Sequence, residues 1–324
     1  MQKQKRYLSI DEQIELLSSK GLRIPSPKSA KQYLTNIGYY KLINGYKKPF
    51  IVKQNGITRF IDEASINDLY HLYFFDKNLR ELLLRNLNSI EISIKSKMID
   101  YITKNFGVTE NDYLNPCFYK SNSKKPFIDI QSGILNTIQK QKGKQSSIRH
   151  YAKNYGYYPF WCVANVLTFG ELCHLYSVMK QPDQYEISKN FKVKAEWLES
   201  AMIIMQLFRN ACAHNEIIYC FKTFAFHLNQ SEWSDLYSTF NIKINPTTGK
   251  YESGTNDLLC IFFIFKLILD QGDFNTFISQ YKSIQENLKK KVTPQVYKRI
   301  ESIIGIPNSF DKLTTMTRVL NNKK

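Results

Sequence analysis

The stretch of residues 66–105 constrains the fold most, because its forty residues contain neither glycine nor proline. Apolar side chains recur along it at spacings of three and four, the period of one face of an α-helix. They are Leu69, Leu72, Leu79, Leu82, Leu83, Leu87, Ile90, Ile94, Met98 and Ile102. The stretch therefore predicts one long helix or two nearly collinear helices.

Two shorter helices are predicted ahead of it. In "SIDEQIELLSSKG", Ser9 and Glu12 stand at the spacing of a capping box, in which each satisfies a backbone N–H of the first turn. In "SPKSAKQYLTNIG", Ser26 is the expected N-cap, Pro27 the first helical residue and Gly38 the stop. Proline just inside the start and glycine just past the end are typical of helix boundaries.

The convincing β signal is "IVKQNGITRFID", where Asn55-Gly56 separates two β-branched runs. Asn-Gly favours the tight turn of a two-residue hairpin. We therefore predict a mostly α fold, with a bundle of long antiparallel helices as its core and a small hairpin.

The rest of the chain predicts further helices, with a polar loop at 138–147 ("IQKQKGKQSS") and a mixed region at 221–269. Proline residues 294 and 307 are expected to break the basic helical tail. The predicted helices are 160–179, 195–219 and 274–320. We divide the chain into a basic N-terminal helical segment, a helical core and a C-terminal helical extension, at residues 1–62, 63–225 and 226–324.

The formal charge of +17 at pH 7 costs a compact state self-repulsion unless a polyanion offsets it. The basic excess lies in three segments: residues 1–60 carry 12 Lys and Arg against 3 acids, 120–155 carry 8 against 1, and 281–324 carry 10 against 3. A phosphate-binding surface assembled from separate segments is expected of such a chain. The alternative is a lysine-rich surface that reflects only an AT-rich bacterial genome.

The six cysteines form no C-x-x-C pair and show no metal-ligand spacing with the five histidines. We expect reduced cysteines, no metal and no cofactor. The N-terminus lacks the pattern of a signal peptide, and the most apolar run, 258–265, is too short to span a bilayer. The expectation is a cytoplasmic protein without membrane contact.

One apolar helix ends unusually, in "FRNACAHNEIIY". Its stripe consists of Trp197, Ala201, Met205, Phe208 and Cys212, and Arg209 and Asn210 fall beside that stripe rather than opposite it. Asn210 and His214 are four residues apart and so lie on the same side of a helix. Charged groups at the edge of an apolar face need a compensating partner, such as a phosphate or a second copy of the helix.

Phosphodiester cleavage in RNA would use these side chains. A histidine such as His214 can take the proton of a ribose 2′-OH or give one to the leaving oxygen. The guanidinium of Arg209 can stabilise the charge that develops on the phosphorane. No metal is needed, and because one histidine cannot easily be both acid and base in one turnover, two copies of the motif are favoured.

The alternative is structural: backbone carbonyls and acids such as Glu216 would satisfy both side chains. Glu91, a lone acid in "NSIEISIKSK", could orient Arg209 across the core. It could equally contact Lys95 on its own helix or face solvent.

Aromatic and basic residues are interleaved in "GYYKLINGYKKPF" (38–50). Tyrosines there could stack unpaired bases, but we favour a structural role for Tyr39 and Tyr40, with rings that pack against the bundle. We assign RNA contact to the lysines of this segment and of the polar loop: Lys41, Lys47, Lys48, Lys142 and Lys144.

"RNACAHNE" resembles the R-[N/D/H]-x(3 to 5)-H signature of HEPN ribonuclease domains. Three further blocks resemble, in order, those of the abortive-infection Abi family of the AbiD/AbiF type: "YLTNIGYYKLINGYKKPF", "LYFFDKNLRELLLRNLNSIEISIKSKM" and "PFWCVANVLTFGELCHLYS". The resemblance covers residues 8–219, and the C-terminal third matches less clearly.

The resemblance implies an all-α HEPN core at 63–225 and a toxin-like role in antiphage defence. It implies metal-independent endoribonuclease cleavage that leaves a 2′,3′-cyclic phosphate and a 5′-hydroxyl. Arg209 would stabilise the phosphate, His214 would act as acid and base, and Asn210 would orient. It also implies a homodimer, and a structured small RNA as a conceivable inhibitor.

Two rival hypotheses remain open. One is an RNA-binding protein that does not cleave, in which Arg209 and His214 hold RNA or stabilise a dimer. The other is a DNA-contacting regulator that uses the basic tail, although no recognition helix is evident.

Overall fold

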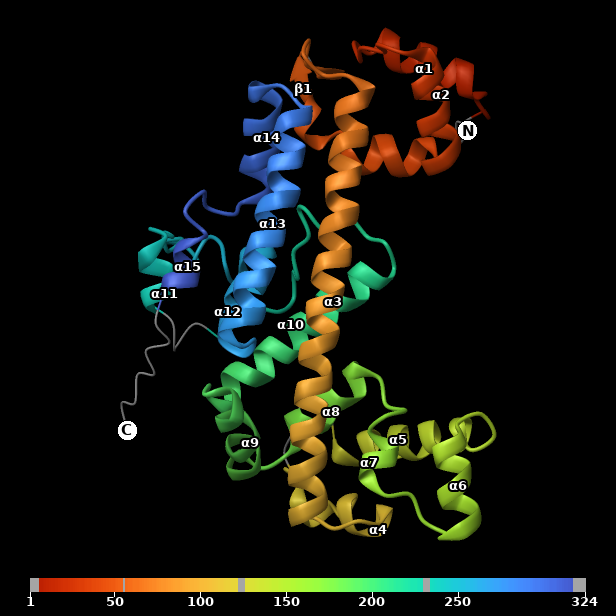
Figure 1. The fold of residues 1–324 in the computed structure, drawn as a ribbon, viewed down its shortest axis with the longest axis vertical. Helices are drawn as coiled ribbons and strands as arrows, with labels where there is room; N and C mark the ends of the chain where they lie inside the picture. The colour runs from red at the N-terminus through yellow and green to blue at the C-terminus, as the bar shows by residue number, and fades with distance from the viewer. Residues whose placement is uncertain (1–5, 55, 122–125, 230–233, 317–324) are drawn as a thin grey trace. The chain divides into compact units, whose positions relative to one another are not determined.

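The computed structural model describes residues 6–54, 56–121, 126–229 and 234–316 (Figure 1). Most of these residues are helical, and one two-stranded antiparallel hairpin is the sheet among them. The prediction of a mostly α fold with a small hairpin is therefore confirmed. The described chain forms two compact units, each built from separated segments.

Unit 1 comprises Met1–Leu83, Ala211–Phe221 and Asn275–Asn308, and unit 2 comprises Leu84–Asn210, Lys222–Phe274 and Ser309–Lys324. Both units therefore take residues from more than one part of the sequence. The division at residues 62 and 225 stays a prediction.

Unit 1 begins with short helices followed by the hairpin. Its elements up to residue 60 are α1 (Ile10–Ser19), α2 (Pro27–Ile37), a π-helical turn η1 (Tyr40–Asn44), a 3₁₀ turn η2 (Lys48–Phe50), β1 (Ile51–Gln54) and β2 (Ile57–Phe60). The capping box of Ser9 and Glu12 is present, as are the Ser26 cap and the stop at Gly38. The hairpin pairs Ile51 with Phe60, and the predicted turn residue Asn55 lies outside the described residues.

The stretch 66–105 forms a single continuous helix, α3 (Ile66–Asn105), which is the long vertical rod in Figure 1. All ten residues of its predicted apolar stripe are buried. Its first part, up to Leu83, belongs to unit 1, and the rest belongs to unit 2.

The C-terminal part of unit 1 consists of most of α13 (Gln271–Lys291) and of α14 (Pro294–Ile304). The guanidinium of Arg299 on α14 donates hydrogen bonds to the backbone carbonyls of Pro49 and Ile51. These bonds fasten α14 to the beginning of the hairpin.

Unit 2 contains the second part of α3 and a set of mostly short helices. They are α4 (Glu110–Tyr113), η3 (Pro116–Phe118), α5 (Phe127–Gln141), α6 (Ser146–Asn154), α7 (Phe160–Val163), α8 (Phe169–Val178), α9 (Gln181–Ser188), η4 (Lys189–Phe191), α10 (Ala195–Ala213, except its last turn), α11 (Ser234–Thr239), α12 (Leu258–Ile268) and α15 (Lys312–Thr315). Helix α5 packs on α8 within this unit (Figure 1).

Two predicted boundaries were wrong. The polar loop is shorter than 138–147, because α5 continues to Gln141 and α6 starts at Ser146. The stretch 160–179 forms two helices, because Thr168 and Glu171 make a capping box that starts α8. The predicted breaks of the tail at prolines 294 and 307 are confirmed, because these residues stand at the start and after the end of α14. Residues 317–320 lie outside the described part.

No helix in the described ranges is long and apolar enough to cross a bilayer. All six cysteines are free thiols, four of them buried, with Cys117 exposed and Cys220 half-buried.

Candidate active site

Helix α10 carries the first two residues of the predicted motif. Its stripe of Trp197, Ala201, Met205, Phe208 and Cys212 is buried, as predicted. Arg209 and Asn210 stand beside this stripe and are half-buried. The sequence pattern thus placed both side chains correctly at the border of the apolar face.

The helix ends at Ala213 rather than continuing to Tyr219, which corrects the predicted boundary. Asn215 has a left-handed backbone, with φ of 57°. Its N–H donates to the Cys212 carbonyl over 3.2 Å, and the Glu216 N–H donates to the Ala211 carbonyl over 2.9 Å. These two bonds are the Schellman arrangement that closes a helix C-terminus. His214 is therefore the C-cap residue, and it is exposed.

Arg209 lies near a carboxylate and an amide but makes no short hydrogen bond to either. Its Nε lies 3.7 Å from Oε2 of Glu91 on α3, beyond hydrogen-bond distance. Its Nη1 lies 3.5 Å from Oδ1 of Asn210, at the long limit for a hydrogen bond. The buried Nε atom has no hydrogen-bond partner in the described part of the chain, while 38% of the side chain is exposed. The attraction to the Glu91 charge therefore holds the guanidinium in place, and its Nε donor is unused.

Glu91 lies between two cations. Its Oε1 is 3.9 Å from Nζ of Lys95, one turn further along α3, and the side chain is only 12% exposed. Pairing with Arg209 and contact with Lys95 therefore occur together. The interpretation of Glu91 as a solvent-facing acid was wrong.

A buried polar cluster in unit 1 fixes the backbone that follows His214, and sequence reasoning missed it. Oδ1 of Asp76, on α3, accepts the N–H of Ile218 over 3.0 Å and that of Tyr219 over 2.6 Å. Its Oδ2 accepts the hydroxyl of Tyr46 over 2.7 Å and a short contact from the Arg80 guanidinium. The carboxylate thus receives four donors, which is its full capacity.

Arg80 completes this cluster by donating from Nη1 to the Glu216 backbone carbonyl over 3.1 Å. The segment that follows the motif histidine is therefore tied down at its carbonyl and at two amides. The carboxylate of Glu216 is exposed, and the assigned orienting role of that residue stays a prediction.

The electrostatics of the cluster favour an ionised Asp76 at neutral pH. Burial raises the pKa of Asp76, and Arg80, Tyr46 and the two amides oppose that rise. Every group around it is a donor, and a carboxyl that only accepts hydrogen bonds must be deprotonated. Burial, reinforced by the Asp76 charge, raises the pKa of the Tyr46 hydroxyl far above its usual range, so Tyr46 stays a donor.

The sequence does carry a signal for Asp76. The apolar stripe of α3 has a gap of seven residues between Leu72 and Leu79. The position that would fill this gap at spacings of four and three is Asp76. A lone acid at a core position must find buried partners. An i, i+4 pair such as Asp76 and Arg80 is easily taken for a surface pair instead.

The basic segment 38–50 lies in unit 1. Lys48 is exposed, Lys41 and Lys47 are half-buried, and Nζ of Lys47 donates to Oδ1 of Asn44 over 2.7 Å. Tyr40 is 81% exposed, so the interpretation that its ring packs against the helices was wrong. Tyr39 is half-buried, which raises the pKa of its hydroxyl.

Lys142 and Lys144 lie in unit 2, in the turn between α5 and α6, and both are exposed. The Lys142 ammonium is 5.9 Å from the centre of the Tyr158 ring. RNA contact by the five assigned lysines stays a prediction.

Cys212, within the motif, is buried. Burial, with the nearby Asp76 charge, raises the pKa of its thiol to about 12. Because the thiolate is the nucleophilic form, this cysteine is inert at neutral pH. In the described ranges no group of three or more His, Cys, Asp or Glu side chains is arranged to hold a metal ion.

Comparison with protein families places the chain. The model of a family described as Abi-like protein matches residues 32–220, a range that includes the Asp76 cluster and the motif. No curated protein and no solved structure matches the chain.

Proposed function

This chain belongs to the Abi-like protein family, and on that premise we propose that it is an antiphage effector of abortive infection, of the AbiD/AbiF type. We propose that residues 63–225 act as a HEPN ribonuclease domain that cleaves RNA through attack of a ribose 2′-OH, without a metal. The products would be a 2′,3′-cyclic phosphate and a 5′-hydroxyl.

The observation that carries this proposal is the open guanidinium of Arg209. Its side chain is 38% exposed, so a ligand can reach part of the guanidinium, and it is charge-paired with Glu91 at 3.7 Å rather than closely hydrogen-bonded to it. A guanidinium binds phosphate oxygens through two parallel N–H donors. Arg209 would therefore stabilise the developing phosphorane charge, while the adjacent Asn210 orients it.

His214 would move the protons. It is exposed at the end of α10, and the segment that follows it is held by the Asp76 cluster. A histidine held there can take the 2′-OH proton or supply one to the leaving oxygen. Because the chain has one such motif, we propose a homodimer in which two histidines share the two roles.

A structured RNA would hold the nuclease inactive until infection. Exposed lysines such as Lys48, Lys142 and Lys144 would contact its phosphates, and each such contact makes binding sensitive to salt.

The test is cleavage of total RNA by the purified protein in EDTA, with mapping of both product ends. Arg209→Ala and His214→Ala should each lower cleavage by at least about a hundredfold, the usual cost of losing a transition-state donor or an acid–base group. Arg149→Ala and His150→Ala are the matched controls, because both residues are exposed and lie outside the motif. These controls should cleave like the wild type.

The non-cleaving alternative is an RNA-binding protein that uses the same exposed lysines. Tight RNA binding by the wild type and by all four variants, with no cut product from any, would favour it over the nuclease. A steeper salt dependence on duplex DNA than on structured RNA of the same length would favour a DNA partner instead.

A further inference from the structure

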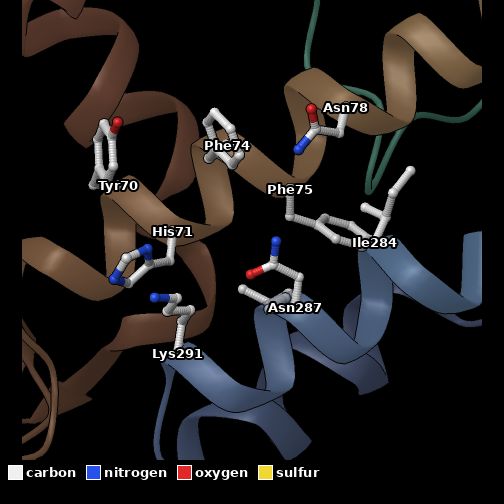
Figure 2. A pocket seen from close by; sticks show the side chains of 9 residues that line it. Tyr70, His71, Phe74, Phe75, Asn78, Ile284, Asn287 and Lys291 are labelled. Atoms are coloured by element: carbon white, nitrogen blue, oxygen red, sulfur yellow. The ribbon is translucent and has the colours of Figure 1, made fainter.

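Unit 1 contains a pocket that the proposed chemistry does not use. It lies between α3 and α13 and has a volume of about 220 Å³. Its wall includes Tyr70, His71, Phe74 and Asn78 from α3, and Asn287 and Lys291 from α13 (Figure 2). Typical drug-sized pockets measure roughly 300–1,000 Å³, so this one fits a smaller group.

One wall is a supported aromatic surface. The Tyr70 ring is stacked on Tyr33 behind it, with centroids 4.0 Å apart and planes 8° apart. Phe74 continues the surface, its ring 6.4 Å from that of Tyr70 and inclined by 23°, and it is 42% exposed. An exposed ring beside a stacked pair is the kind of platform on which an unpaired base stacks.

The polar side chains offer both donors and acceptors. Figure 2 shows the carboxamides of Asn78 and Asn287 directed into the space between the two helices, and each provides a carbonyl and an NH₂ group. Burial lowers the pKa of His71, as does the charge of Lys291, and Asp68 opposes them. A neutral imidazole adds one donor and one acceptor, so the set matches the edge of a nucleobase.

Positive charge stands at one side of the pocket. Lys291 is the last residue of α13, and its ammonium lies beside His71 (Figure 2). A phosphate attached to a base on the aromatic wall would be attracted to this end.

We propose that this pocket binds one unstacked nucleotide. The base would stack on Phe74 and Tyr70, its edge would hydrogen-bond to Asn78 and Asn287, and its phosphate would lie at Lys291. The nucleotide could be part of an RNA strand or a free mononucleotide. The inference shares with the proposed function the premise that nucleotides are the ligand, but it does not depend on cleavage.

The test is calorimetric titration of the full chain with AMP, with UMP and with a six-nucleotide single-stranded RNA, all methylated at the 2′-oxygens so that cleavage cannot occur. Phe74→Ala and Asn287→Ala should each weaken binding at least about fivefold, the loss of one base stack or one base-edge contact. Lys291→Ala should also lower the salt slope for the RNA by about 0.7. Lys290→Ala is the matched control, because it removes the same charge from the same helix outside the pocket, and it should bind within about twofold of wild type.

Binding of the hexanucleotide alone would identify an RNA strand as the ligand, and equal binding of the mononucleotides would identify a free nucleotide. The proposal fails if nothing binds saturably, or if Lys290→Ala weakens binding as much as Lys291→Ala. Saturable binding by a wild type that cleaves no RNA would reject the nuclease and keep the pocket.

Discussion

The two arginine–carboxylate pairs Arg80–Asp76 and Arg209–Glu91 each use an acid on α3, yet they differ in almost every physical respect. The side chains of the first pair, in unit 1, are 5% and 0% exposed and in direct contact. Those of the second, in unit 2, are 38% and 12% exposed, and the nearest atoms are 3.7 Å apart. The first carboxylate has every acceptor position filled, whereas the second guanidinium has an unused Nε.

The difference in burial between the two pairs suits them to different roles, one in stabilising the fold and the other in binding a ligand. A buried pair whose carboxylate already accepts four hydrogen bonds has no acceptor left for a ligand. Breaking the pair leaves an uncompensated charge in the interior. A partly exposed pair contributes only about 0–1 kcal/mol to stability, so its charge can serve another partner. The first pair therefore has a structural role, and phosphate binding by the second stays our proposal.

Removing the buried carboxylate should have the largest effect. Asp76→Ala leaves Arg80 buried without its counter-charge and frees the amides of Ile218 and Tyr219. We expect a loss of about 3–5 kcal/mol in the free energy of unfolding, measured by urea denaturation.

Replacing both partners sharpens this test. Asp76→Leu combined with Arg80→Met fills the same space with apolar groups and leaves no unpaired charge, so it should be less destabilising than Asp76→Ala alone. A double variant that is as unstable as the single one would show that the hydrogen bonds to residues 216–219 matter more than the charge.

Removing the Arg209 guanidinium should have a small effect on stability and a large effect on RNA cleavage, unlike Asp76→Ala. Arg209→Ala should change the free energy of unfolding by less than about 1 kcal/mol and raise the barrier to RNA cleavage by about 2.7–4 kcal/mol. Arg209→Lys keeps the charge but loses the two-pronged donor, so it should recover little activity. If Arg209→Ala lowered the free energy of unfolding as much as Asp76→Ala does, the distinction between the two pairs would be wrong.

Neutralising Glu91 should have an intermediate effect. Glu91→Gln leaves Arg209 and Lys95 without their shared counter-charge, so the guanidinium is less well placed. We expect kcat for RNA cleavage to fall about tenfold, which corresponds to about 1.4 kcal/mol, with little change in KM. Unchanged kcat would show that Glu91 does not position Arg209.

The reactivity of Cys212 should give the smallest effect. Because burial and then the Asp76 charge raise the pKa of this thiol to about 12, iodoacetamide at pH 8 should label exposed Cys117 and spare Cys212, as read by mass spectrometry of peptides. Labelling of Cys212 should increase in Asp76→Ala and stay unchanged in Arg209→Ala. Equal labelling in both variants would mean that the two pairs are equally embedded in the fold.

Local rules predicted the elements well because those elements depend on neighbouring residues. Helix α3 follows from its apolar spacing, and the hairpin follows from the turn at Gly56 between β-branched runs. The border position of Arg209 also follows from the stripe on its own helix.

The partners of these residues could not be predicted, because they come from elsewhere in the chain. Asp76 is joined to the backbone of Ile218 and Tyr219, about 140 positions away, and no local pattern encodes that distance. The end of α10 at Ala213 depends on the left-handed backbone of Asn215, which asparagine tolerates but does not require. From the sequence, Glu91 could equally have contacted Arg209, contacted Lys95 or faced solvent.

The hydrogen bonds from Arg299 to the carbonyls of Pro49 and Ile51 bear on how far the protein can be shortened. The range shared with its family ends at residue 220, but a fragment that ends there would lose α13 and α14. Those two carbonyls would then lack their donor, and the apolar residues that α14 covers would meet water. Residues 275–308 thus belong to the same compact unit as His214, and deleting them should yield insoluble protein rather than a smaller soluble one.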